Sequence, residues 1–558
     1  MPSIKPTGVP DMPATLTPPG TRGRTPAPAP PRPPRAPAAT WVIPLILGAI
    51  TVFGLWWIDV RPAAIAAGFE DITRLLGRMF PATTGPVPEL AALVLETLQI
   101  AIAGTGIAAL VSIPLAAGAA NTFTGPRWVQ WLCRTLIVVS RAVPSLVFAI
   151  IFVRIFGLGP AAGALAIAFH SVGMIGKMMT DVFEEISASP REAVNATGAN
   201  RFQVFVATTF TQALPQMTSF VLYRLDINIR ASSVLGLVGA GGIGVALQRS
   251  IGSLDYPRAA GIIAGIIVLL LVLELISNLV QRAVSEHAGD TQHSMAFPPG
   301  KELSTPGWNA PRVGRSAGLL AGVVLFLLSL SALNISPDRL ARGWENAVAM
   351  LTGFVPPVFT AEIALGLFES LVMAFTATTF GVLIGLVIAV FSTDHLVRVP
   401  VLGWALRGVI VVVRGVPDIV YAIVFVAALG LGPFAGFLAL AISCTALASK
   451  FFTDALQNID PGPIRALEAV GAGRLQAFVA GAWPQFVPSF IGNSLFTADL
   501  ALRESAVLGI VGAGGIGFLL HESVTSIDYQ TTAGILIGLI VVVVAVEQMA
   551  RWARRKVI

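Results

Sequence analysis

Charged residues are scarce in this chain. Of its 558 residues only 12% are Asp, Glu, Lys or Arg, whereas 55% are hydrophobic. Soluble domains carry about 25% charged residues, so the composition excludes an ordinary water-soluble protein. Several apolar runs approach the roughly 20 residues that a helix needs to cross a hydrocarbon core, for example at 41–58, 259–276, 316–333 and 532–547. We therefore expect an all-α integral membrane protein.

Cysteine and histidine are also few. The two cysteines, Cys133 and Cys444, lie in or beside apolar runs, which favours small buried side chains over a disulfide framework. The five histidines do not form the H-E-x-x-H pattern of a zinc site. A phosphate-binding Walker loop is missing too, because Gly176-Lys177 has no glycine at the required distance before it. We expect no metal, no cofactor and no ATPase in this chain.

The net charge of +6 does not indicate a nucleic-acid partner. The cationic residues sit mainly at the ends of apolar runs, as the orientation of a membrane protein requires. Residues 1–40 are rich in Pro, Ala, Thr and Arg and are expected to form a disordered cytoplasmic tail. No secretory signal pattern precedes the first span, which we interpret as an uncleaved anchor.

The sequence is present twice, at a shift of 273 positions. Residues 230–244 (RASSVLGLVGAGGIG) match residues 503–517 (RESAVLGIVGAGGIG) at 12 of 15 positions. The same shift, without a gap, superimposes GLGP at 157–160 on GLGP at 430–433. This register predicts two fused repeats, 41–284 and 315–558, joined by a hydrophilic cytoplasmic linker at 285–314.

Each repeat has apolar stretches for about six membrane spans. An even number gives both repeats one orientation, so a pseudo-twofold axis along the membrane normal is expected, with a path between the halves. The distribution of Lys and Arg places both termini in the cytoplasm and the segment 59–89 outside. The predicted spans are 41–58, 90–118, 131–156, 160–180, 207–232 and 258–282, then 315–335, 363–391, 402–429, 433–453, 480–505 and 531–550.

The string GAGGIG matches G-x-G-x-x-G in both repeats. A dinucleotide-binding loop would follow a strand and open a βαβ unit, whereas here each copy follows an apolar span, so that function is excluded. Two interpretations stay open: small residues for close helix packing, or a broken backbone that lines and gates a path. The glycines concerned are Gly239, Gly241 and Gly242, and their counterparts Gly512, Gly514 and Gly515.

A polar loop with a short amphipathic helix follows the fourth span of each repeat. The segments are EEISASPREAVNATGANRFQVF (184–205) and QNIDPGPIRALEAVGAGRLQAF (457–478). Either helix is too short to cross the membrane and would lie at its cytoplasmic surface. Two such helices at equivalent positions suggest two attachments for two copies of a partner.

These loops resemble the E-A-A…G signature of the permease subunits of bacterial ABC importers. Departures are Arg465 in place of Glu, Thr211 at the position of the final Pro, and Trp483 in place of Leu. The resemblance implies a type I permease fold and assigns ATPase coupling to Glu192, Ala193, Gly198, Arg201, Ala466, Glu468, Gly471 and Arg474.

Within that family the chain resembles the phosphonate-type permeases through R-x-S-x-V-L-G-x-V-G-A-G-G-I-G, SRAVPSLVFA (140–149) and VRGVPDIVYA (413–422). The resemblance implies a fused permease dimer in the bacterial inner membrane that imports phosphonate, phosphite or phosphate. It further implies two copies of a cytoplasmic ABC ATPase, which would hold ATP and Mg²⁺, and an extracytoplasmic substrate-binding protein.

Placing a charged side chain inside a membrane span is energetically unfavourable, so such side chains usually face a cavity or pair with each other. Asp226 and Arg230, repeated as Asp499 and Arg503, form either a salt bridge or part of an anion path. Arg141 and Arg414 either extend to lipid headgroups or line the same path. Symmetry is broken where Arg224 is replaced by Thr497 and Ala231 by Glu504.

Two other classes of function agree less well with these features of the sequence. A secondary transporter driven by an ion gradient would move a similar small anion but has no need of paired coupling helices. A membrane-embedded enzyme would need a nucleophile–base pair or a metal cluster, which the sequence does not offer.

Overall fold

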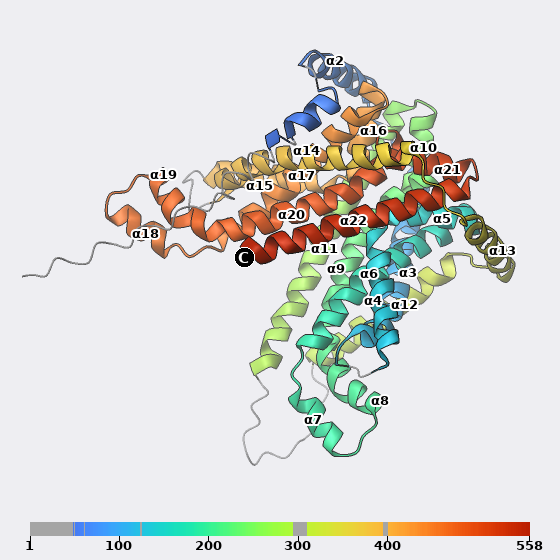
Figure 1. Ribbon diagram of the computed structural model, residues 1–558, viewed down its shortest axis with the longest axis vertical. Coiled ribbons are helices and arrows are strands. Elements are labelled where there is room, and N and C mark those ends of the chain that lie inside the picture. Colours follow the sequence, from blue (N-terminus) through green and yellow to red (C-terminus); the bar gives the residue numbers. More distant parts are fainter. Residues whose placement is uncertain are drawn as a thin grey trace, which may run out of the picture. The chain divides into compact units, whose positions relative to one another are not determined.

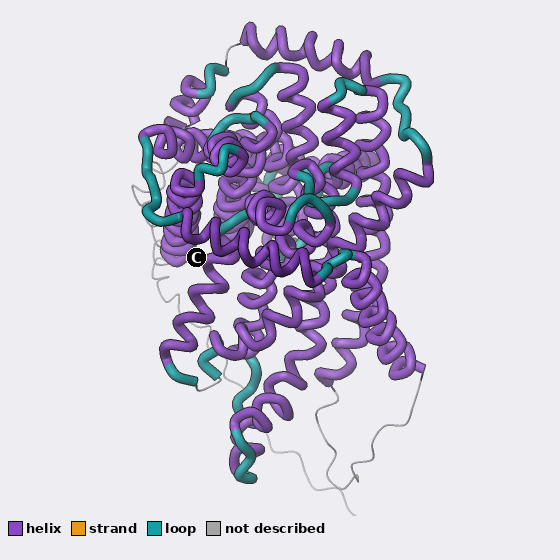
Figure 2. The backbone as a smooth tube through the Cα atoms, turned by 90° about the vertical axis from the view of Figure 1, so that its right-hand side faces the viewer, coloured by secondary structure: helices purple, strands orange, loops and turns teal. Residues whose placement is uncertain are grey.

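The computed structural model describes residues 48, 49, 51–60, 62–122, 125–293, 310–393 and 400–557. The described residues form helices and loops, with no strand among them (Figure 2). Seven helices are long and apolar enough to cross a membrane, and counting each of four bent pairs as one span raises the number to 11. The predicted all-α membrane fold is confirmed. The predicted tail, the first seven residues of the first predicted span and the middle of the linker lie outside the described residues.

The first repeat begins with a helical segment at 51–57. An amphipathic helix follows in the segment expected only as an outside connection. The helices are α2 (Pro62–Met79), α3 (Val87–Ala119), α4 (Arg127–Ala142), α5 (Ser145–Phe156), α6 (Pro160–Glu185), α7 (Ser189–Ala196), α8 (Arg201–Val204), α9 (Thr211–Leu235), α10 (Ile243–Gly252) and α11 (Tyr256–His293).

The second repeat has the same helices in the same order. Ile243 begins α10 and Ile516, 273 residues later, begins α21. The helices are α12 (Ala310–Ala332), α13 (Pro337–Gly353), α14 (Ala361–Ser392), α15 (Pro400–Gly415), α16 (Asp418–Leu429), α17 (Pro433–Gln457), α18 (Gly462–Ala469), α19 (Arg474–Ala477), α20 (Trp483–Leu508), α21 (Ile516–Thr525) and α22 (Tyr529–Val557).

The third predicted span of each repeat is broken rather than continuous. Helices α4 and α5 meet at 96°, and α15 and α16 meet at 81°. Pro144 and Pro417 stand at the breaks, where each lacks an amide hydrogen and disfavours helical geometry in the residue before it. Val143 is accordingly extended, with φ −95° and ψ 125°.

The two halves exchange their first helices. The segment 51–57 packs against α14, where the ring centroids of Trp57 and Phe368 lie 5.2 Å apart, and α12 packs reciprocally against α3. Helix α2 likewise contacts α16, and α13 contacts α5, where Asn346 Nδ2 donates to the carbonyl of Ile155 at 2.9 Å (Figure 1). Each half is therefore covered on one side by elements of the other.

Candidate functional site

The glycine strings lie just after the fifth predicted span of each repeat, where the helix is interrupted. Helix α9 ends at Leu235, one 3₁₀ turn follows, and α10 starts at Ile243. All six predicted glycines have a positive backbone φ, a conformation that residues with a side chain rarely adopt. The values are +83° at Gly239, +87° at Gly241, +77° at Gly242, +86° at Gly512, +81° at Gly514 and +76° at Gly515.

Each glycine loop is held by the GLGP turn of the same repeat and by one long helix, α3 in the first repeat and α14 in the second. Gly159 N donates to Gly239 O at 3.0 Å, and Gly432 N donates to Gly512 O at 2.9 Å. The amide that opens α10, Ile243 N, donates to Thr97 Oγ1 of α3 at 2.8 Å. Protein groups thus satisfy the broken backbone, as a break at membrane depth requires. The loops are tight packing joints, and a role as gate stays a prediction.

Two of the predicted arginines bridge the halves. Arg141 Nη2 on α4 lies 3.1 Å from Glu547 Oε1 on α22, with both side chains about four-fifths buried. Arg230 Nη1 on α9 donates to the carbonyl oxygen of Arg414 on α15 at 3.2 Å. Arg141 is therefore directed at a carboxylate of the other half, not along the lipid boundary.

The second-half pair forms the predicted salt bridge. Arg503 Nη2 lies 2.8 Å from Asp499 Oδ2 one turn earlier on α20, and both side chains are largely buried. The matching Asp226–Arg230 bridge stays a prediction. In Arg141, Arg230 and Arg503 the Nε atom is buried without a hydrogen-bond partner. These three Nε donors are therefore enclosed by the described protein, and only the terminal guanidinium nitrogens form the contacts described above.

Two carboxyl groups near these arginines escaped the sequence reasoning as site residues. Asp418 begins α16 just after the Pro417 break, and its Oδ1 accepts from Ser443 Oγ of α17 at 2.5 Å. Glu504 of α20 interacts electrostatically with both Asp418 and Arg503, and Arg230 acts on Asp418 from the other half. The signal in the sequence was the broken symmetry, because Glu504 stands opposite Ala231 and Asp418 stands opposite Ser145. Charges of both signs therefore meet between the halves.

The short helices α7 and α18 project from the ends of the two repeats together with α8 and α19 (Figure 1). Gly198 and Gly471 follow them with φ of +80° and +87°, so the predicted glycine turns are present. The other predicted coupling residues with described side chains are exposed, namely Glu192, Ala193, Arg201, Ala466 and Glu468. The side chain of Arg474 lies outside the described set.

Large apolar side chains stand exposed beside both short helices. Phe202 is 70% exposed and Leu475, its counterpart one repeat later, is 75% exposed. Val470 at the end of α18 is 81% exposed. Sequence reasoning missed them because one apolar residue gives no contrast in a chain this hydrophobic.

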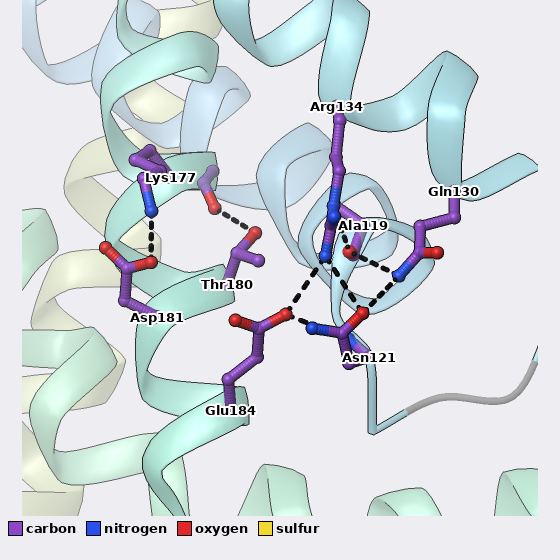
Figure 3. A network of polar contacts seen from close by, with 9 residues as sticks. Ala119, Asn121, Gln130, Arg134, Lys177, Thr180, Asp181 and Glu184 are labelled. Atoms are coloured by element: carbon purple, nitrogen blue, oxygen red, sulfur yellow. Dashed lines mark hydrogen bonds and ion pairs between the residues drawn. The ribbon is translucent and has the colours of Figure 1, made fainter.

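A polar network fixes the end of the first repeat from which α7 projects (Figure 3). Arg134 Nε donates to Ala119 O at 2.9 Å, and its Nη2 lies 3.2 Å from Glu184 Oε1. Arg191 of α7 donates to the carbonyl of Thr122, just after α3, at 3.4 Å. The short helix is therefore linked to the membrane helices through side-chain hydrogen bonds.

Comparison with known proteins agrees with this duplicated architecture. The profile of the family described as "Binding-protein-dependent transport system inner membrane component" matches twice, at residues 112–288 and 381–558. The phosphate-import permease protein PhnE of Mycolicibacterium smegmatis is 37% identical over 512 residues, covering 91% of this chain and 93% of that protein.

Shorter relatives match parts of the chain. The phosphite transport system permease protein PtxC of Stutzerimonas stutzeri is 34% identical over 219 residues, 39% of this chain and 80% of that protein. The putative cryptic phosphonate transport system permease protein PhnE2 of Escherichia coli is 35% identical over 118 residues, 21% of this chain and 97% of that protein. This chain therefore belongs to the family of binding-protein-dependent transport system inner membrane components, as a multi-pass membrane protein with two copies of the family domain in one polypeptide.

Proposed function

We propose that this chain is the transmembrane permease subunit of an ATP-driven importer for phosphate, phosphite or a phosphonate. The observation that carries the coupling part is the pair of exposed helices, α7 and α18, at equivalent positions of the two repeats. The substrate class is supported by the relatives, whose names specify phosphate, phosphite and phosphonate.

Coupling would take place at these two helices. Each repeat presents its short exposed helix, the glycine turn that follows it, and one exposed apolar side chain, which is Phe202 in the first repeat and Leu475 in the second. Buried apolar anchors surrounded by polar groups are typical of protein interfaces. One copy of a cytoplasmic ABC ATPase would bind each helix and hold ATP and Mg²⁺, and both termini of this chain would lie on the same cytoplasmic side of the bacterial inner membrane.

Transport would occur between the halves. An extracytoplasmic binding protein would deliver the oxyanion to the outer end, and the halves would move as rigid bodies around the path. Arg141, Arg230 and Arg503 lie near the contact between the halves and would offer terminal guanidinium nitrogens to the anion there. The bridges from Arg141 to Glu547 and from Arg230 to the Arg414 carbonyl join the halves, so they would break or form as the path opens.

Uptake into proteoliposomes tests the proposal. The chain is reconstituted with its ATPase and binding protein, and uptake of labelled phosphate, phosphite and methylphosphonate is measured with ATP inside. Uptake that requires ATP hydrolysis is expected for at least one of them. Failure to move any of the three would refute the substrate class, and uptake driven by an ion gradient without ATP would refute the coupling.

The docking part has a separate test. Phe202→Asp combined with Leu475→Asp should abolish co-purification of the ATPase, because a charge replaces the apolar anchor on both sides. The control is Leu254→Asp, at an apolar side chain that is 64% exposed just beyond α10. Equal recovery of the ATPase with the double variant and the control would contradict docking at these helices.

A further inference from the structure

One arginine inside the first repeat has no carboxylate among the described residues to balance its charge. Arg224 lies in the middle of α9 and is only 5% exposed. No Asp or Glu in the described part of the chain forms an ion pair with it or acts on its charge. Buried cations in membrane proteins are ordinarily paired, because an isolated charge is strongly unfavourable there. The position therefore requires an anion that the described side chains do not supply.

A chain of buried hydrogen bonds holds this guanidinium in place. Arg224 Nε donates to Ser171 Oγ at 3.1 Å, and Ser171 Oγ donates to Asn228 Oδ1 at 3.0 Å. Asn228 Nδ2 then donates to Thr105 Oγ1 at 2.8 Å. Three helices, α3, α6 and α9, contribute to the chain, and each of these four side chains is at least 95% buried. Only one of the five guanidinium N–H donors is used, so the two terminal nitrogens keep a fixed and open fork.

The surroundings link this guanidinium to the contact between the halves. His170, next to Ser171 on α6, lies within electrostatic reach of both Arg224 and Arg503 of the second half. Its Nδ1 lies 2.9 Å from the carbonyl oxygen of Val143, at the break between α4 and α5. Arg503 is already balanced by Asp499, whereas none of the described carboxylates is paired with Arg224.

The second repeat lacks this arrangement at the equivalent positions. At the equivalent positions 273 residues later stand Thr497, Cys444 and Ala501, so the cation and its hydrogen-bond chain are both missing. Thr497 donates to the carbonyl of Asn493 one turn earlier. If Arg224 were needed only for helix packing, the second repeat would be expected to carry the same residue. The charge is present in the first repeat alone of the two equivalent positions.

We infer that Arg224 binds the transported tetrahedral oxyanion inside the first repeat, so that one chain holds one anion there. The inference rests on the proposed function and adds a residue and a location to it. The terminal nitrogens match two oxygens of one phosphorus group, which the planar fork can engage at the same time. Ser171 and Asn228 act as positioning residues that fix the fork.

Equilibrium binding to the purified chain in complex with its ATPase, without nucleotide, tests the site separately from transport. Binding of labelled phosphate, phosphite and sulfate is measured for the wild type, Arg224→Gln, Arg224→Lys and the repeat-equivalent control Thr497→Val. Only protein that elutes as a single species in size exclusion is used. Loss of a hydrogen-bonded charge should weaken binding about tenfold to a hundredfold in Arg224→Gln. Arg224→Lys should retain part of the affinity, and the control all of it.

Each outcome decides the matter. Equal affinity in the wild type and Arg224→Gln, or no anion binding by either, overturns the inference. Binding of sulfate but of neither phosphorus anion, again lost in Arg224→Gln, keeps the anion site and refutes the proposed substrate class. A charged arginine needed only for folding would reduce the yield of monodisperse protein in Arg224→Gln but leave the affinity of the folded fraction unchanged.

Discussion

Substitution of Gly241 by alanine should destabilise the protein strongly, although it adds a single methyl group. Gly241 has φ of +87°, and a left-handed conformation costs a residue with a side chain about 1–2 kcal/mol. The added Cβ would lie 2.8 Å from Glu96 Oε1 and 3.1 Å from Pro160 Cα. Overpacking of this kind adds about 1–3 kcal/mol. The sum is a loss of about 2–5 kcal/mol.

Gly252→Ala is the matched control. Gly252 belongs to α10 of the same repeat, and a Cβ there would meet nothing within 4 Å. Alanine at such a site is neutral or stabilises by about 0.4–1 kcal/mol. Heating of the detergent-solubilised variants, followed by size exclusion, gives the temperature at which half of each is lost. Gly241→Ala should fail at a clearly lower temperature than the wild type, and Gly252→Ala should not.

The same two variants separate packing from gating. A loop that only packs should leave ATP-driven uptake per folded molecule unchanged in Gly241→Ala at a temperature where the variant stays intact. Reduced uptake by intact protein would show that the loop also moves during transport. Thermal stability of Gly241→Ala equal to that of the wild type would refute the structural reasoning itself.

Three further predictions concern the coupling turns, the bridge between halves and an exposed carboxylate. Gly198→Trp with Gly471→Trp should leave ATPase activity but abolish ATP-driven uptake, because the two turns need positive φ; normal uptake in that double variant would contradict coupling there. Arg141→Gln, Glu547→Gln and their combination should give a coupling energy of about 1–3 kcal/mol in unfolding experiments, and strict additivity would show that the 3.1 Å contact contributes nothing. Hydrogen bonds from the start of α22 lower the pKa of Asp528, which lies in the loop before that helix. Its contribution to stability is therefore present above the pKa of the unfolded chain, about 3.9, and is lost as pH falls through the folded value; Asp528→Asn should remove this part of the acid sensitivity, measured as the midpoint of acid unfolding.

The duplication was readable from the sequence because a gapless shift preserves helix boundaries. The membrane class was equally readable, since long apolar runs determine which solvent a helix can enter. The glycine turns at Gly198 and Gly471 could be predicted as well, because such backbone conformations strongly favour glycine.

The candidate site was only partly readable. The pattern offered the Asp499–Arg503 bridge as one of two interpretations, because residues four apart share a helical face. It gave no means to pair Arg141 with Glu547, which lie 406 positions apart. The role of Arg224 was also hidden, because the sequence shows that a charge is present but not which side chains surround it.

By itself, the sequence determined that this is a duplicated helical membrane protein with two equivalent surface helices, because periodicity and composition act locally along the chain. Tertiary structure alone decided that each half is covered by the first helices of the other, that the GLGP turn holds the glycine loop, and that one buried guanidinium has no counter-ion among the side chains that the structure describes. These features depend on contacts between distant segments, and packing geometry, not local propensity, selects such contacts.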